Sequence, residues 1–270
     1  MKIINPLLLL VLWLGCVDAI ADASPFAGAN RTPEFVARDS YRHPVETLAF
    51  FQVEPGMTVV EISPGAGWYT EILAPLVQHG DADQGLLYAA HFPEDSGVPY
   101  YERSLARFTA KLAADPTVYG DVILSTFDPA NGVLTVPDGV ADRVVTFRNV
   151  HNWLRSDSEG KAFELFFRAL KPGGVLGVVE HRTGRTIDRA EMIRSGYMPE
   201  AYVIELAEKA GFVLAAKSEL NANPKDTTDH PEGVWTLPPS LRLQEKDREK
   251  YQAIGESDRM TLKFIKPAAP

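Results

Sequence analysis

The sequence of 270 residues has little cysteine and no stripe of basic residues. Cys16 is the only cysteine, and the apolar run from Leu7 to Leu14 is too short to cross a bilayer, which needs about 20 residues. Lysine and arginine form no cluster that could neutralise a phosphate backbone, and the formal net charge is −9. We therefore expect neither a stable membrane anchor nor a nucleic-acid partner.

The first residues have the pattern of a secretory signal. Lys2 precedes the apolar run, and Ala21-Asp22-Ala23 has the spacing of small residues that precedes signal cleavage. We predict a signal peptide over residues 1–23, cleaved before Ser24. The mature chain is then expected to be exported to the periplasm.

Two alternatives to this cleavage stay open. Gly15 precedes Cys16, and acylation of that cysteine would make a lipoprotein, although Trp13 is a poor fit three positions before it. The segment could also remain as an uncleaved anchor. Cleavage after Ala23 would remove Cys16, so the mature chain would have no disulfide, no thiolate nucleophile and no cysteine metal ligand.

Strand and helix patterns alternate along residues 24–270, which we expect to form a single domain. About 250 residues with 45% apolar composition can supply one large core. The continuous β-branched run Thr58–Ile62 is typical of a strand buried on both faces. Further strands are predicted at Leu86–Ala90, Asp121–Phe127, Asp142–Phe147, Val175–Glu180, Phe212–Leu220 and Met260–Ile265, and helices at Pro44–Phe51, Trp68–Val77, Tyr100–Ala113, Ser158–Leu170 and Pro199–Ala210. This alternation predicts an α/β fold with a doubly wound, mostly parallel, seven-stranded Rossmann-like sheet.

The segment 221–257 does not fit this alternation. It is rich in proline and charge, and it is longer than an ordinary connection between two strands. Trp235 and Leu237 indicate that part of it packs against the domain. We therefore predict a long insertion or a lid.

A glycine loop, Ser63 to Gly67, joins the predicted strand Thr58–Ile62 to the next helix. Glycines at this place let the backbone approach a bound nucleoside and leave amide donors free. A dinucleotide loop would have a third glycine where Thr70 stands, and Glu61 would repel a pyrophosphate. A tight turn that binds nothing is the remaining alternative.

The segment Val59 to Gly67 resembles the first motif of class I S-adenosylmethionine-dependent methyltransferases, and Ala169 to Leu176 looks like their later turn before strand five. The resemblance covers nearly the whole mature chain. It is closest to a group of exported predicted methyltransferases that share the segments Arg148–Trp153 and Glu180–Arg182. It implies S-adenosylmethionine as the cofactor and methyl transfer to an acceptor that we expect to be a small molecule.

The resemblance also implies which residues contact the cofactor. His91 stands where the family has a carboxylate that binds the ribose hydroxyls, and a neutral imidazole offers one acceptor at most. Glu94 or Asp95 could take over this role. Asp128 either contacts the adenine or begins a turn. The expected cofactor-binding residues are Glu61, Ser63, Gly65, Ala66, Gly67, Trp68, His91, Asp128, Arg148 and Asn149.

The candidate catalytic residues are His151, Glu180, His181 and Arg182, which lie near the carboxyl ends of two predicted strands, where open α/β sheets bind ligands. His151 could act as a base near neutral pH, or it could be hydrogen-bonded to a loop. Tyr197 is a further candidate.

Two other functions are compatible with the sequence. S-adenosylmethionine is made in the cytosol, so an exported chain with this fold could instead be a binding protein that holds a nucleoside or another small molecule without catalysis. His91, His151 and His181 could together bind a metal. The strands that carry His91 and His151 are separated by another strand, which places their ends roughly 10 Å apart. We therefore predict no metal site.

Overall fold

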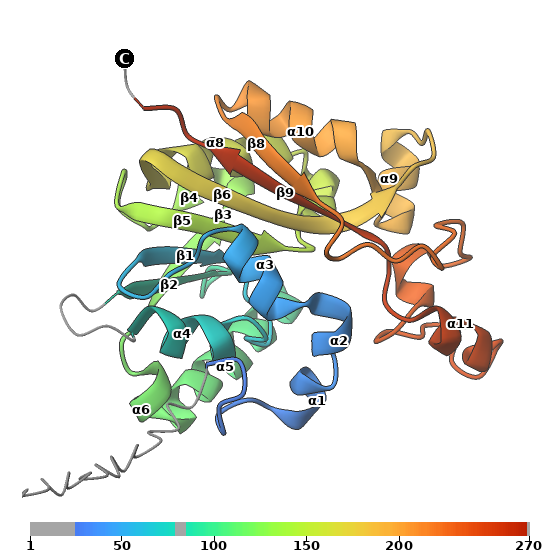
Figure 1. The fold of residues 1–270 in the computed structure, drawn as a ribbon, viewed down its shortest axis with the longest axis horizontal. Coiled ribbons are helices and arrows are strands. Elements are labelled where there is room, and N and C mark those ends of the chain that lie inside the picture. The colour runs from blue at the N-terminus through green and yellow to red at the C-terminus, as the bar shows by residue number, and fades with distance from the viewer. Residues whose placement is uncertain (1–24, 79–84, 269–270) are drawn as a thin grey trace, which may run out of the picture.

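The computed structural model describes residues 25–78 and 85–268, and it shows a central sheet with helices on both faces (Figure 1). The predicted signal peptide and Cys16 lie outside the described residues. Within the described ranges, no helix combines the length and the apolar character that a membrane span requires.

The sheet has nine strands in the order β4-β3-β2-β1-β5-β6-β9-β8, with β7 paired to β6. The strands are β1 (Thr58–Ile62), β2 (Leu86–His91), β3 (Val122–Asp128), β4 (Val133–Leu134), β5 (Ala141–Phe147), β6 (Leu170–Thr183), β7 (Met198–Pro199), β8 (Val213–Ser218) and β9 (Arg259–Ile265). The predicted mostly parallel α/β sheet is confirmed. The sheet has two strands more than the seven predicted. The additional strands, β4 and β7, have two residues each, which is too short for a detectable sequence pattern.

Two strands depart from the parallel arrangement. β4 runs antiparallel to β3. β9 runs antiparallel to both β6 and β8 and lies between them. The last strand of the chain therefore enters the sheet between two strands that precede it in sequence.

Several helices match the predicted ones within two residues, whereas the shortest helices have no predicted counterpart. The helices are α1 (Pro33–Val36), α2 (Asp39–Arg42), α3 (Pro44–Phe50), α4 (Thr70–Gln78), α5 (Pro99–Ala114), α6 (Pro116–Tyr119), α7 (Val150–Trp153), α8 (Glu159–Ala169), α9 (Arg189–Ser195), α10 (Glu200–Lys209) and α11 (Arg248–Ile254), with 3₁₀ turns η1 (Pro129–Asn131), η2 (Leu154–Ser156) and η3 (Gly233–Thr236). A helix of one turn has no apolar periodicity to detect.

Alternate side chains of β1 enter two separate cores. Val60 and Ile62 pack with α8 and α10 on one face of the sheet, and Val59 packs with α3 and α4 on the other. Because both faces are covered, apolar side chains occupy both faces of the strand, and this is the pattern that made it predictable.

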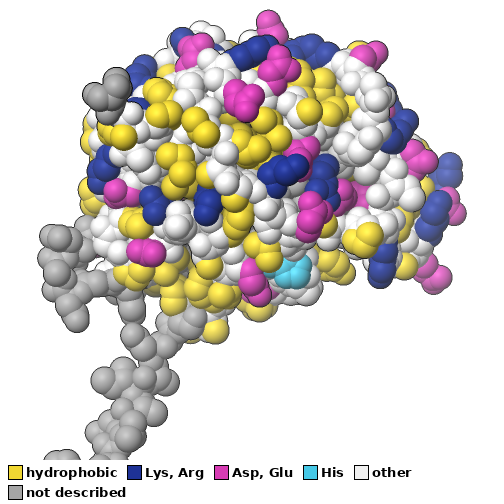
Figure 2. Space-filling view, turned by 45° about the horizontal axis from the view of Figure 1, so that its top comes forward, with side chains coloured by type: hydrophobic (Ala, Val, Ile, Leu, Met, Phe, Trp, Pro, Cys, Tyr) yellow, Lys and Arg dark blue, Asp and Glu magenta, His cyan; other side chains and the backbone are white. Residues whose placement is uncertain are grey.

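Strand β1 lies between β2 and β5. Strands β2 and β3 follow on one side of β1, and β5 and β6 follow on the other side, so the strand order reverses at β1. Such a reversal opens a crevice at the carboxyl ends of the strands. The segment that contains η3 and α11 lies beyond the ends of β6 and β9 (Figure 1). Figure 2 shows basic and acidic side chains that lie beside one another on the surface.

Candidate functional site

Two adjoining cavities form a cleft at the carboxyl ends of the parallel strands. The first has a volume of about 350 Å³ and the second of about 700 Å³. The residues that line both are Ser63, Gly65, Tyr100, Asn149, His151, Asn152 and Trp235. The two cavities therefore meet over the glycine loop and the start of α7.

The two glycines of the loop face different surroundings. Gly65 has φ +60°, and no atom lies within 4 Å of the position that a Cβ would take there. A Cβ on Gly67 would lie 3.2 Å from side-chain atoms of both Phe108 and Lys111. Gly65, with Ser63 and Ala66, therefore opens to the first cavity, whereas Gly67 packs the loop against α5 and lines neither cavity.

Glu61 lines the first cavity at the end of β1. Its Oε2 accepts a hydrogen bond of 2.6 Å from Oγ1 of Thr70, the residue that replaces the third glycine of a dinucleotide loop. Burial raises the pKa of Glu61 to about 7, and the bond from Thr70 only partly opposes this rise. A cationic group beside Glu61 would favour its charged form.

Asn149 and Trp68 complete this side of the cleft. Asn149 Nδ2 donates to the carbonyl of Ile62 at 3.0 Å, which ties the segment after β5 to the end of β1, where the glycine loop begins. Trp68 lines the first cavity, and its Nε1 donates to the carbonyl of Phe35 at 3.0 Å. The guanidinium carbon of Arg42 lies 4.4 Å from the centre of the Trp68 ring.

His91 lies outside both cavities, in contrast to the ribose contact expected from the sequence. The backbone N–H of Phe92 donates to Nδ1 at 2.8 Å, so Nε2 carries the proton and donates to the carbonyl of Gly65 at 3.3 Å. Burial lowers the pKa of His91, which keeps the ring neutral. Its geometry is that of a support for the glycine loop.

The other acidic candidates for a cofactor contact differ in whether they line a cavity. Glu94 and Asp95 are exposed and line neither cavity. Asp128 lines the second cavity, and its carboxylate also accepts from Nδ2 of Asn131 at 2.7 Å, as expected of a residue that begins a turn. Among the described residues, Asp128 is the only carboxylate that lines the second cavity.

Glu180 holds His151 in place from below the cleft. The carboxylate is fully buried and accepts from the backbone N–H groups of His151 at 3.2 Å and His181 at 2.7 Å. Its Oε1 also lies 3.0 Å from Nδ1 of His151. Nε2 is therefore the ring nitrogen of His151 that a ligand can reach. Glu180 lines neither cavity, so it can act on a ligand only by orienting His151.

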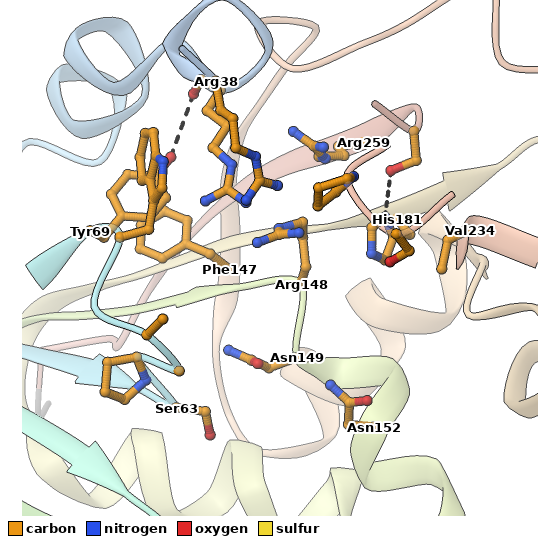
Figure 3. Close-up of a pocket in the computed structure, with 18 of the residues that line it drawn as sticks. Arg38, Ser63, Tyr69, Phe147, Arg148, Asn149, Asn152, His181, Val234 and Arg259 are labelled. Carbon is orange, nitrogen blue, oxygen red and sulfur yellow. Dashed lines mark hydrogen bonds between the residues drawn. The ribbon is translucent and has the colours of Figure 1, made fainter. Parts of the chain in front are cut away.

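His181 lines the first cavity beside His151, with 5.1 Å between the ring centres. Its Nδ1 lies 2.6 Å from Oγ of Ser257 (Figure 3). Burial, reinforced by the neighbouring His151, lowers the pKa of His181 well below its ordinary range. The ring is neutral at physiological pH.

Arg182 and Tyr197 are not part of the cleft. Strand β6 continues to Thr183, past its predicted end, so Arg182 is paired within the sheet. Its guanidinium forms ion pairs with Asp258 at 2.9 Å and Glu219 at 2.7 Å. The Tyr197 hydroxyl is buried and donates to the Asp226 carboxylate at 2.7 Å. The bond from Tyr197 ties the segment 221–257 to the domain, and Arg182 binds residues on either side of that segment.

Ligand atoms of His151, Glu180 and His181 lie within 4.8 Å of one another, which is compatible with a metal site, and His91 is not part of this group. The Glu180 oxygens already accept hydrogen bonds from the backbone of both histidines. This arrangement fits a carboxylate that orients an imidazole better than one that presents a free ligand atom.

Several residues that line the cavities are not among the predicted site residues. Trp235 lines both cavities, so the segment 221–257 forms a wall of the cleft. The first cavity is also lined by Arg38, Arg42 and Arg259, which lie far from the recognised motifs. No local sequence pattern distinguishes them from surface arginines.

No family model and no curated protein matches the chain. Several solved structures are similar to it in fold. A SAM-dependent methyltransferase from Aquifex aeolicus has a TM-score of 0.56 and 16% identity, over 85% of this chain and 93% of that one. The [4+2]-cyclase SpnF has a TM-score of 0.56 and 17% identity, over 85% and 82%. Phosphoethanolamine N-methyltransferase 2 from Haemonchus contortus, in complex with S-adenosyl-L-methionine, has a TM-score of 0.52 and 15% identity, over 84% and 53%. These similarities show that the chain has the Rossmann-like fold of the class I methyltransferases.

Proposed function

We propose that the chain is an S-adenosylmethionine-dependent methyltransferase that acts on a small molecule. The observation that carries the proposal is the arrangement of Gly65, where the two cavities meet, and Glu61, which lines the first of them. Gly65 leaves space for a ligand at the backbone, and Glu61 presents a buried carboxylate to a cationic group. Methyltransferases with the same fold support this interpretation.

The chain's own residues would bind the donor and exclude water. The backbone at Gly65 would approach the nucleoside, Glu61 would pair with the ammonium of the donor, and Asn149 would orient it. When bound, S-adenosylmethionine supplies an electrophilic methyl group. His151, oriented by Glu180, would accept the acceptor's proton at Nε2, and Trp235 would shield the cleft from water.

We further propose that residues 24–270 act as one exported domain, related to the exported methyltransferase group, with part of 221–257 as a wall of its site. Ala21-Asp22-Ala23 supports cleavage before Ser24. Mass spectrometry of the exported protein is expected to give a mature chain that begins at Ser24. A diacylglyceryl adduct on Cys16 would overturn this proposal.

A binding protein without catalysis is the second candidate. It is favoured by the end of β2, where His91 is turned inward and neither Glu94 nor Asp95 lines the cleft. A donor bound without a carboxylate on its ribose would be held weakly. The fold also occurs in the [4+2]-cyclase SpnF, so it does not by itself imply methyl transfer.

Isothermal titration of the chain with S-adenosylmethionine, S-adenosylhomocysteine, adenosine and zinc separates these candidates. The proposed function predicts that both sulfur compounds bind and that zinc does not. Binding of adenosine but of neither sulfur compound would favour the binding protein. Binding of zinc that is lost in the Glu180→Gln variant would favour a metal site at His151 and His181.

A further inference from the structure

Four arginines from separate parts of the chain line the first cavity. Arg38 and Arg42 come from the α1–α2 region, Arg148 follows β5, and Arg259 begins β9. Figure 3 shows Arg38, Arg148 and Arg259 directing their guanidinium groups toward the same part of the cavity. The arrangement concentrates positive charge at one end of the cleft.

Among the described residues, Glu256 is the only carboxylate paired with these arginines. Arg38 Nε donates to Glu256 Oε1 at 2.6 Å, and Arg259 also donates to this carboxylate. Arg42 Nε lies farther away, at 3.7 Å. The Arg148 side chain has no hydrogen bond or ion pair within the described ranges. Four guanidinium groups thus face one directly paired carboxylate.

The next carboxylate does not remove this excess of positive charge. Glu180 acts electrostatically on Arg148, but its oxygens are bonded to His151 and His181. The Glu180 carboxylate is therefore used in hydrogen bonds to the two histidines, and the Arg148 side chain has no hydrogen-bonded partner among the described residues.

Several N–H groups of these arginines also lack acceptors. Arg42 and Arg259 are 3% and 2% exposed. Arg42 Nε and Nη2, Arg259 Nε and Arg38 Nη2 are buried with no hydrogen-bond partner in the part of the chain that the structure describes. Buried polar groups in folded proteins are normally bonded, so these donors indicate a ligand with several acceptor atoms.

The ionisation of the cluster reflects the same excess of charge. Burial lowers the pKa of Arg42 well below its ordinary range, and the charge of Arg148 lowers it further. Burial and the charge of Arg259 lower the pKa of Arg148 to about 10. Burial alone would raise the pKa of Glu256, but Arg259 and Arg42 outweigh it and lower that pKa to about 2. A bound anion would relieve the repulsion among the arginines.

We infer that these four arginines form an oxyanion subsite for the methyl acceptor, which is then a small molecule that carries a carboxylate or a phosphate. This inference rests on the proposed function. The donor's single α-carboxylate can neutralise only one positive charge, so the cluster leaves positive charge for a second anionic group. Guanidinium groups bind carboxylate and phosphate through paired hydrogen bonds. An acceptor anchored at Arg148 would lie in the same cavity as His151.

The test is calorimetric titration of inorganic phosphate, and separately of succinate, into the full chain saturated with S-adenosylhomocysteine. At least one anion is expected to bind. The Arg148→Gln variant is expected to bind it about tenfold more weakly or worse, the size of one charge-assisted hydrogen bond. Arg107→Gln, at an exposed position on α5, removes the same charge and is the matched control. Arg38→Gln serves as a second variant if Arg148→Gln does not fold.

The outcomes separate the inference from the proposed function. If S-adenosylhomocysteine binds but neither anion does, the subsite is wrong and the proposed function stands. If Arg148→Gln weakens S-adenosylhomocysteine but not 5′-methylthioadenosine, which lacks the amino acid part, the arginines hold the donor's carboxylate and the inference is overturned. If S-adenosylhomocysteine does not bind, the proposed function fails and the acceptor assignment fails with it, even if an anion binds to the ligand-free chain.

Discussion

Glu180 meets His151 at two points, with Oε1 at 3.0 Å from Nδ1 of the ring and Oε2 at 3.2 Å from the backbone nitrogen. One buried carboxylate therefore fixes both the ring and the main chain of the residue that we propose as the base. It also accepts from the backbone of His181. The pair thus links the end of β6 to the start of α7 across the floor of the cleft.

Replacement of Glu180 by Gln is expected to lower the free energy of unfolding by about 1–3 kcal/mol, because the amide nitrogen cannot accept the hydrogen bonds that a carboxylate oxygen accepts. Urea denaturation measures this change. Glu208→Gln on the exposed side of α10 is the control and should change stability by less than about 0.5 kcal/mol. Equal stabilities of the two variants would show that the buried pair is not needed.

The affinity for S-adenosylhomocysteine is expected to rise between pH 6 and pH 8. The pKa of Glu61 is raised to about 7, so the carboxylate that would pair with the ligand's ammonium forms in this range. Below pH 7 the rise should approach tenfold per pH unit and should level off above it. Glu61→Gln should remove the pH dependence. The ligand 5′-methylthioadenosine, which has no ammonium, should show none with either protein.

The same carboxylate predicts a pH-dependent stability of the ligand-free protein. Its pKa in the folded state is above the ordinary value of 4.5, so stability is fully present at low pH and is lost as the pH rises toward 7. Glu61→Gln should therefore be more stable than the natural chain at pH 8, by as much as about 3 kcal/mol, and not at pH 4.5. Urea titrations at the two pH values check this. If the difference in stability between Glu61→Gln and the natural chain is the same at both pH values, the raised pKa of Glu61 is wrong.

Gly65→Ala is expected to weaken S-adenosylhomocysteine by about tenfold or more while the domain still folds. The added Cβ would enter the space at the backbone that the ligand needs. Gly139→Ala is a matched control, because Gly139 has φ +66° and equally open surroundings but lies away from both cavities. Both variants carry the same backbone strain. Equal loss of affinity in the two would attribute the effect to strain and not to the site.

His91→Asp should not tighten the binding of S-adenosylhomocysteine. Both ring nitrogens of His91 are bonded inside the protein, and the ring packs 5.2 Å from that of Phe108. A carboxylate there would be buried and would face the carbonyl of Gly65, so the variant should melt at a lower temperature. Thermal melts with and without ligand test this. A gain in affinity would instead restore His91 to the ribose site.

The sequence predicts the sheet and the glycine loop because their signals are local. The run Thr58–Ile62 coincides with β1, and Ser63 to Gly67 follows it as a loop. Position in the loop does not reveal which glycine faces a ligand, however. Gly65 opens to the cavity and Gly67 packs on α5 because of where α5 lies, which no local pattern specifies.

Of the four arginines of the cleft only Arg148 is predicted from the sequence, and Arg38, Arg42 and Arg259 could not be predicted for a related reason. α1 and α2 have four residues each, too few for an amphipathic pattern, and Arg259 is separated from them by most of the chain. Only the sheet order brings these segments together. Arg182 is the converse case, since its motif suggested the cleft but the continuation of β6 places it in an ion-pair network.

The bond between Arg38 and Glu256 joins residues 218 positions apart, and it has a consequence for the order in which the molecule can assemble. Strand β9 must insert between β6 and β8 before Arg259 reaches the cavity. A chain that is synthesised from its amino terminus thus contains β1, the glycine loop and His151 long before the four arginines can come together. Ligand binding should therefore be the last property that the chain acquires, and release before residue 259 would give a chain that lacks both β9 and Arg259.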